Sequence, residues 1–238
     1  MSKSTHTPTP EQIELVRWAA SLGAVTAEAL AHRRGVSVAS ARARLGAARR
    51  AGLLSRERPL TEHPALFGAT RAGLRACGAR GIDICRITSS NAHHLTVCAA
   101  VAAALERCYP DHRVSGEHEL RRDERDHDGP LASAQLGWLH ARGTGRHRPD
   151  LVLWPSVAAR ERPVAVEVEL TIKAPRRLRD ICRAWARSQT VAGVLYFAPP
   201  DVERALSRAI ERARASERVI VLPLDCLLGV DGGAADIG

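Results

Sequence analysis

Aromatic residues make up only 3% of this 238-residue sequence, so its apolar content of 45% rests on alanine, valine and leucine. No run of about eighteen apolar residues occurs, which argues against a membrane-spanning helix. The first residues, Met-Ser-Lys-Ser-Thr-His, lack the apolar core of a secretion signal. With 26% charged residues, the composition predicts a soluble globular protein in the cytoplasm, without a membrane partner.

Motifs for several common chemistries are also missing. The six cysteines stand at positions 77, 85, 98, 108, 182 and 226 without a C-x-x-C pair, which argues against a zinc site and against a disulfide framework. The sequence has no phosphate-binding glycine loop, no dinucleotide glycine pattern and no Ser-His-Asp arrangement. Histidines such as His118, His127, His140 and His147 show no ligand spacing, which predicts surface positions.

Lysine is almost absent, because only Lys3 and Lys173 are lysine among 35 basic residues. The net charge of +9 is unevenly placed: residues 1–88 contain 14 basic and 6 acidic residues, whereas residues 89–238 contain 21 and 20. Positive charge concentrated in a small N-terminal region is typical of a protein that binds a phosphate backbone. It predicts double-stranded DNA as the partner.

The N-terminal region reads as three short helices, a hairpin and a fourth helix. Thr26 and Ser37 are expected to cap the second and third helices, and Thr70 to open the fourth. The expected helices cover 11–22, 27–34, 38–50 and 71–77, and the expected strands cover 53–58 and 65–69.

This order resembles winged helix-turn-helix DNA-binding domains over residues 10–80. The resemblance rests on Thr26-Ala27-Glu28-Ala29-Leu30, Ser40-Ala41-Arg42-Ala43-Arg44-Leu45, Ala51-Gly52-Leu53-Leu54 and Thr70-Arg71-Ala72-Gly73-Leu74. In that family the third helix enters the major groove and the hairpin is the wing. The resemblance implies DNA contacts by Ser40, Arg42, Arg44 and Arg49 on the helix, and by Arg56 and Arg58 on the wing.

Helical spacing agrees with that implication. Arg42 and Arg49 lie two turns apart on one face, and the opposite stripe is apolar. That stripe consists of Val38, Ala41, Leu45 and Ala48. The alternative is a solvated helix in a protein that is rich in arginine throughout.

The C-terminal region carries acids on an apolar strand. Residues 164–172 alternate so that Glu167, Glu169, Thr171 and Lys173 are expected on one face. Asp150 precedes a shorter apolar run at 151–153. Carboxylates in such a strand are costly to bury unless a cation or a metal compensates them.

Pro149-Asp150 and Glu167-Val168-Glu169 resemble the motif of the PD-(D/E)xK nucleases, the restriction-endonuclease-like fold. In that family the Asp and the Glu hold Mg²⁺, or Mn²⁺ in its place, and a Lys two residues after the Glu positions the attacking water. The resemblance implies metal ligation by Asp150 and Glu167. Position 169 is Glu instead of Lys, and if Glu169 is the motif acid the Lys position is Thr171.

Lys173 is the remaining candidate for the missing lysine, because it is the one lysine of the expected folded region. A compact ammonium can orient a water beside a metal in a way that a guanidinium cannot. The candidate catalytic residues are therefore Asp150, Glu167, Glu169 and Lys173, and Glu117 joins Asp150 and Glu167 as a candidate metal ligand. The alternative is a solvated lysine at a strand end.

The remaining pattern completes a mixed sheet flanked by helices. A buried helix is expected at 94–108, a strand at 114–120 carrying Glu117 and Glu119, a mobile charged loop at 121–146, a helix at 176–186, a strand at 191–197, a helix at 200–215 and a strand at 219–224. This order matches the nuclease fold and predicts an α/β or α+β class.

The predicted domains are a disordered lead (1–9), the winged helix (10–80), a linker (81–92), the nuclease-like domain (93–230) and a tail (231–238). The whole pattern, including His93-His94-Leu95, resembles the replication-relaxation family of plasmid and integrative-element proteins, whose members commonly lack the nuclease lysine.

Three functions stay open from the sequence. The first is a DNA-binding protein of a plasmid or mobile element whose nuclease-like domain does not cut. The second is a Mg²⁺-dependent endonuclease using Asp150, Glu167 and Lys173. The third is a transcription repressor, which would be favoured if Arg176, Arg177 or Arg179 neutralised the acids. A homodimer is expected, because winged-helix proteins often read two half-sites.

Overall fold

The computed structural model describes residues 7–137, 145–156, 159 and 161–228. The chain divides into two compact units, Met1–Ala103 and Ala104–Gly238. Residues 1–6 of the predicted lead and the whole predicted tail lie outside the described residues. No helix within the described ranges is long and apolar enough to cross a membrane.

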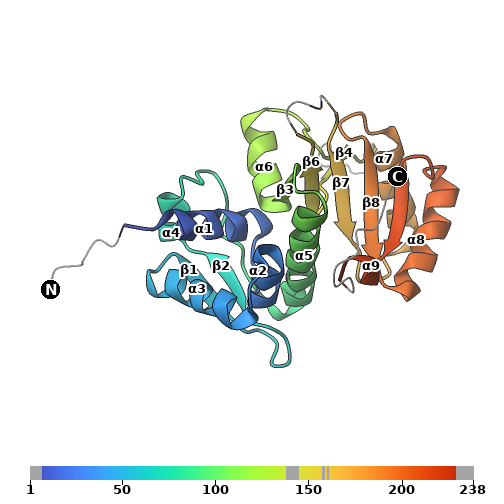
Figure 1. The fold of residues 1–238 in the computed structure, drawn as a ribbon. Coiled ribbons are helices and arrows are strands. Elements are labelled where there is room, and N and C mark those ends of the chain that lie inside the picture. Colours follow the sequence, from blue (N-terminus) through green and yellow to red (C-terminus); the bar gives the residue numbers. More distant parts are fainter. Residues whose placement is uncertain (1–6, 138–144, 157–158, 160, 229–238) are drawn as a thin grey trace. The chain divides into compact units, whose positions relative to one another are not determined.

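The first unit consists of helices and one small antiparallel hairpin (Figure 1). Its elements are α1 (Pro10–Leu22), α2 (Ala27–Arg34), α3 (Val38–Arg50), β1 (Leu54–Glu57), β2 (Leu66–Ala69) and α4 (Arg71–Ala76). Helix α5 (Ser89–Cys108) follows and contains the boundary between the units, so that it begins inside the expected linker.

The predicted helix caps of this unit are confirmed. The hydroxyl of Thr26 accepts a hydrogen bond from the amide of Ala29, and Ser37 and Thr70 do the same for the residues three positions on. These bonds satisfy amides that have no partner within the helix. The stripe expected on α3 is confirmed for Ala41, Leu45 and Ala48, but it is wrong for Val38, which lies in the first turn and is 37% exposed.

The second unit is built on a five-stranded mixed sheet with the order β3-β6-β7-β8-β9. Strands β3, β6 and β7 pair antiparallel, and β7, β8 and β9 pair parallel. Its elements are β3 (Arg113–Gly116), α6 (Glu117–Asp126), β4 (Ala134–Gln135), β5 (Arg146–His147), β6 (Leu151–Trp154), β7 (Val164–Val168), α7 (Pro175–Arg187), β8 (Gly193–Ala198), α8 (Pro200–Ala213), β9 (Val219–Pro223) and α9 (Asp225–Leu228).

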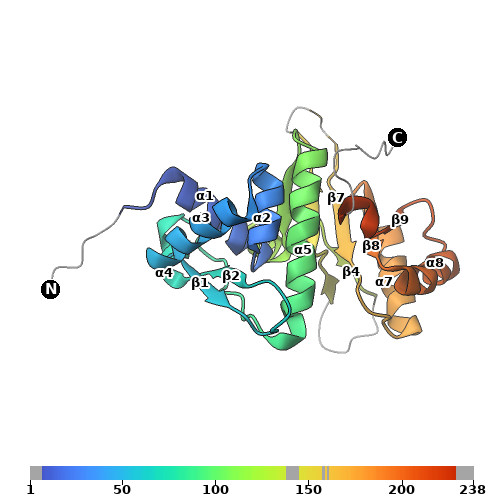
Figure 2. The same ribbon diagram turned by 60° about the horizontal axis from the view of Figure 1, so that its bottom comes forward.

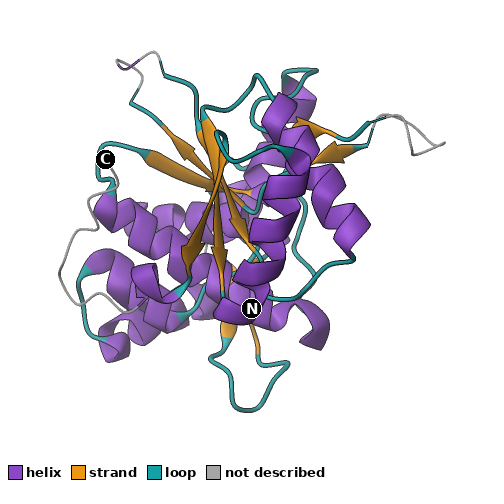
Figure 3. Ribbon diagram, turned by 90° about the vertical axis from the view of Figure 1, so that its right-hand side faces the viewer, coloured by secondary structure: helices purple, strands orange, loops and turns teal. Residues whose placement is uncertain are grey.

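Helices α7 and α8 are the connections between the parallel strands, and they pack against one another beside the sheet (Figures 1 and 2). Figure 3 shows that the strands of the sheet are twisted. Such a twist has a fixed hand, because it arises from backbone sterics. The core that these helices share with the sheet includes Trp185 of α7, Leu206 of α8 and Tyr196 of β8, all fully buried. Antiparallel β4 and β5 form a separate hairpin whose Ala134 joins this core.

The expected strand at 114–120 is confirmed only for 114–116, and the expected loop at 121–146 is wrong where α6, β4 and β5 lie; residues 138–144 of that loop lie outside the described residues. Strand β3 ends at Gly116, and Glu117 begins helix α6. The segment is charged, but its charges follow helical spacing: Arg121 pairs with Glu117 and Arg122 pairs with Glu119. Acids in the first turn also interact favourably with the helix dipole. These interactions favour a helix from Glu117 onward, although the residues from Val114 onward suggest the alternation of a strand.

The predicted strand at 164–172 is also too long. Strand β7 ends at Val168, and the amide of Glu169 makes the last ladder bond, to the carbonyl of Phe197. The partner strand ends there because Pro199 and Pro200 follow, and proline cannot donate to a ladder. Ile172, expected on the apolar face, is 59% exposed.

A buried ion pair fixes the chain between α6 and β6. Glu124 is 1% exposed; one of its carboxylate oxygens accepts from Arg148 Nε at 2.9 Å. The other accepts from the amides of Leu131 and Ser133, at 3.1 and 3.2 Å. Glu124 therefore holds both the turn after α6 and the segment that leads into Pro149-Asp150.

We expect Glu124→Ala to lower the free energy of unfolding by about 3–5 kcal/mol, because it removes the partner of the partly buried Arg148 and the acceptor of the Leu131 and Ser133 amides. Urea unfolding followed by circular dichroism measures this change. The matched control is Glu117→Ala, which breaks a half-exposed pair with Arg121 and should cost no more than about 1 kcal/mol. Equal losses in the two variants would contradict the anchoring role of Glu124.

Candidate functional site

The acids singled out in the sequence lie at one end of the central strands. Asp150 directly precedes β6, and Leu151 is opposite Val166, so Asp150 meets β7 next to Glu167. The Oδ2 atom of Asp150 accepts a hydrogen bond of 2.7 Å from the backbone amide of Val168. The structure thus brings Asp150 and Glu167 together, as predicted, and gives Asp150 a backbone donor.

Glu167 is buried in the middle strand of the sheet, with 3% of its surface exposed. Its Oε1 atom lies 2.6 Å from Nε2 of His147 and accepts a hydrogen bond of 3.1 Å from the indole Nε1 of Trp185. Burial raises the pKa of Glu167, and the attraction of His147 offsets this only in part. The carboxylate is therefore held by protein donors from β5 and α7.

His147 is the residue that the sequence interpretation missed. It was expected at the surface, but it lies on β5, is partly buried and contacts Glu167. Burial lowers the pKa of His147, but the Glu167 carboxylate outweighs this and the pKa is raised above its usual value. The two groups together hold a proton more firmly than either would in water. In the sequence, His147 stands three residues before Asp150, in Arg-His-Arg-Pro-Asp at 146–150. This closeness was the one sequence signal that His147 belongs to the site.

Trp185 and Cys182 complete the surroundings of Glu167. The ring of Trp185 packs edge-on against His147, with centroids 5.6 Å apart. Burial, assisted by the nearby Glu167, raises the pKa of the Cys182 thiol to about 12, so that thiol is not a nucleophile near neutral pH. The buried face of the amphipathic helix α7 supplies both residues.

Glu169 and Lys173 form an ion pair just beyond β7. Glu169 is 4% exposed, and its Oε2 atom pairs with Nζ of Lys173, whose side chain is about one-third exposed. The expected common strand face is wrong for Thr171 and Lys173, since both lie after the strand has ended. Lys173 nevertheless reaches the acidic end of the sheet, because the chain turns back before α7.

Glu117 does not join this group as a metal ligand. It lies at the first position of α6, and its carboxylate pairs with Arg121 on the same helix. Only its backbone comes close to the site: the Glu117 amide donates to the carbonyl of Asp150 at 3.0 Å. The strand assignment had placed its side chain on the wrong element.

The arrangement does not fit a preformed Mg²⁺ site. A hard cation needs several carboxylate oxygens that converge and are free of other donors. Among the described residues, no three of Asp150, Glu167, Glu169 and Glu117 place carboxylate oxygens within 4.8 Å of one another. The acids are instead bound to a backbone amide, to His147 with Trp185, to Lys173 and to Arg121. Arg176, Arg177 and Arg179 are not among these partners.

In the first unit, predicted DNA-contacting arginines come together from two elements. Arg42 on α3, Arg56 on β1 and Arg58 after β1 line one cavity of about 370 Å³. Glu28 on α2 also lines it and lies 3.6 Å from Arg42, in an exposed ion pair. An exposed pair of this kind is weak, so a phosphate can displace it.

The other predicted contacts of this unit are arranged differently. Arg44 pairs with Glu11 of α1, away from the hairpin arginines. Arg49 is exposed near the end of α3, and Ser40 is partly buried in its first turn, where its amide donates to Ser37.

Comparison of the chain with protein-family models, with curated proteins and with solved structures found no match.

We expect Mg²⁺ to leave the stability of the protein unchanged. A site with a dissociation constant of about 1 mM in about 10 mM Mg²⁺ would add roughly 1.4 kcal/mol, a rise in melting temperature of about 3–6 °C. The acids have other donors, so the predicted rise is less than about 1 °C by calorimetry. A larger rise that disappears in Asp150→Asn would show that these carboxylates do bind the ion.

Proposed function

We propose that this chain is a double-stranded DNA-binding protein of a plasmid or mobile element. Its N-terminal unit acts as a winged helix-turn-helix, and its C-terminal unit is a nuclease-like domain that does not cut. The observation that carries the proposal is the cavity shared by Arg42, Arg56 and Arg58. It joins the expected recognition helix to the expected wing in one basic surface.

The arrangement of elements supports the winged-helix part. Helices α2 and α3 pack together, and α3 contacts β1, which pairs with β2. The connection of β1 and β2 carries Arg58, whose Nε donates to the carbonyl of His63 at 3.4 Å. A helix face and a hairpin bearing arginines are the parts with which this class of domain holds a duplex.

Charge supports the same assignment. The first 88 residues carry nearly all of the net positive charge of the sequence, and arginine binds phosphate oxygens in a bidentate way. The ion pairs of this unit, such as Arg44 with Glu11, join α1, α2 and α3, whereas Arg56 of the hairpin forms no ion pair with an acid of the described residues. A homodimer reading two half-sites is part of the proposal.

The order of strands supports the nuclease-like part. Three antiparallel strands followed by a parallel strand after a crossover helix is similar to the core of the PD-(D/E)xK nucleases, and the proximity of Asp150 to Glu167 supports the same resemblance. The donors to Glu167 and the pairing of Glu169 with Lys173 favour a domain that has kept this fold without its metal chemistry.

Duplex binding tests the role of the first unit. We expect the full chain to bind a labelled duplex with an affinity that falls steeply with salt, at a slope of about 0.9 per phosphate contact. Arg42→Gln with Arg56→Gln should reduce that slope by about 1.8 in fluorescence anisotropy. The matched control is Arg204→Gln with Arg214→Gln, two exposed arginines of the second unit. If both double variants lose the same affinity, the binding reflects net charge and not the basic surface of α3 and the hairpin.

A further inference from the structure

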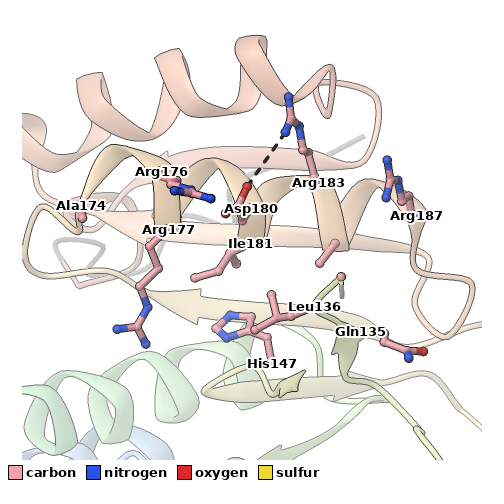
Figure 4. A pocket seen from close by; sticks show the side chains of 12 residues that line it. Gln135, Leu136, His147, Ala174, Arg176, Arg177, Asp180, Ile181, Arg183 and Arg187 are labelled. Carbon is pink, nitrogen blue, oxygen red and sulfur yellow. Dashed lines mark ion pairs between the residues drawn. The ribbon is translucent and has the colours of Figure 1, made fainter. Parts of the chain in front are cut away.

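A cavity of about 910 Å³ lies between α7 and the β4–β5 hairpin in the second unit. Four arginines of α7 line it: Arg176, Arg177, Arg183 and Arg187. The first and the last are eleven positions apart, which is about 16 Å along a helix. Figure 4 shows Arg177 and Arg187 at opposite ends of the cavity.

The cavity is strongly positive. Among the described residues that line it, Asp180 supplies the negative charge, and its Oδ1 atom lies 4.0 Å from Nη1 of Arg183. Four arginines against one acid leave most of the positive charge without compensation from the lining. Arginine clusters with this geometry bind phosphate groups.

The interior of the cavity is apolar. Ile181 of α7 and Leu136, which follows β4, point toward one another across it, with the ring of His147 beside them (Figure 4). His147 is held in place by its contact with Glu167 and by the edge-on packing of Trp185. Ile181 is 2% exposed and forms the floor, so the cavity offers the ring of His147 and the partly exposed side chain of Leu136 between two groups of cations.

We propose that this cavity binds single-stranded nucleic acid, with phosphates against the arginines and a base against His147 and Leu136. A single strand exposes both phosphates and unstacked bases, and proteins bind it by joining a basic groove to surfaces on which bases stack. A duplex keeps its bases stacked inside and could use only the arginines. The inference goes beyond duplex binding by the first unit and does not depend on it.

Anisotropy of a labelled oligothymidylate of about 12 nucleotides, added to the full chain over a range of salt, tests the proposal. We expect saturable binding that Arg177→Gln with Arg187→Gln weakens by about tenfold, with the salt slope reduced by about 1.4. Arg204→Gln with Arg214→Gln changes the net charge equally outside this cavity and should leave the slope intact. Circular dichroism checks that both variants are folded.

Two further arms define the ligand. An oligouridylate of the same length shows whether the site takes RNA as well as DNA, and binding of either strand supports the proposal. Polyglutamate of similar charge has no bases and should compete weakly. Equal competition by polyglutamate, equal weakening by the two double variants, or no saturable binding of either oligonucleotide would overturn the proposal.

The outcome is separable from that of the duplex experiment. Arg42→Gln with Arg56→Gln should lose duplex binding and keep the oligothymidylate, whereas Arg177→Gln with Arg187→Gln should do the reverse. Loss of both ligands in the first variant would place both on the N-terminal unit and would overturn the assignment to the α7 cavity.

Discussion

The buried carboxylate of Glu167 is the group on which the arrangement of the second unit depends. It lies in the central strand and would be costly there without donors. His147 reaches it from the β4–β5 hairpin and Trp185 reaches it from α7. One acid thus ties the hairpin and the crossover helix to the sheet. The same contacts fix the ring of His147 at the edge of the α7 cavity.

These contacts also determine what chemistry the site can support. A nuclease centre needs acids that converge on a metal, and here each acid has a protein partner of its own. Arginines line two cavities elsewhere, one at α3 and the hairpin of the first unit and one along α7 of the second. The arginines are therefore the proposed binding groups, and most of the acids have structural roles.

Much of the fold could be predicted from local signals. Thr26, Ser37 and Thr70 predict the starts of their helices, and the β-branched run at 164–168 predicts its strand. Both signals are local, because capping and periodicity act over a few residues. Asp150 and Glu167 were identified as neighbours through a motif resemblance. The sequence interpretation placed Glu117 in a strand, because apolar and polar residues seem to alternate through Gly116. The structure ends the strand at Gly116 and begins a helix at Glu117. The end of β7 depends on where β8 stops, which is a tertiary fact.

The side chains that surround the acids could not be predicted from the sequence. His147 is 20 residues from Glu167, and Trp185 is 18 residues from it. No local pattern joins a histidine before one strand to a tryptophan late in a helix. The scarcity of lysine did point to the acids, since Lys173 contacts Glu169. In the structure Lys173 is an ion-pair partner of that carboxylate. Tertiary contacts, and not residue types, decide whether such acids bind a metal.

Incubation of supercoiled plasmid with the purified full chain and Mg²⁺ or Mn²⁺ tests the central claim most directly. If the carboxylates are held by protein donors, the plasmid should stay supercoiled to the same extent as with EDTA. Metal-dependent nicking that is lost in Asp150→Ala, Glu167→Gln and Lys173→Ala would contradict the account. It would show instead that these residues form a working nuclease centre.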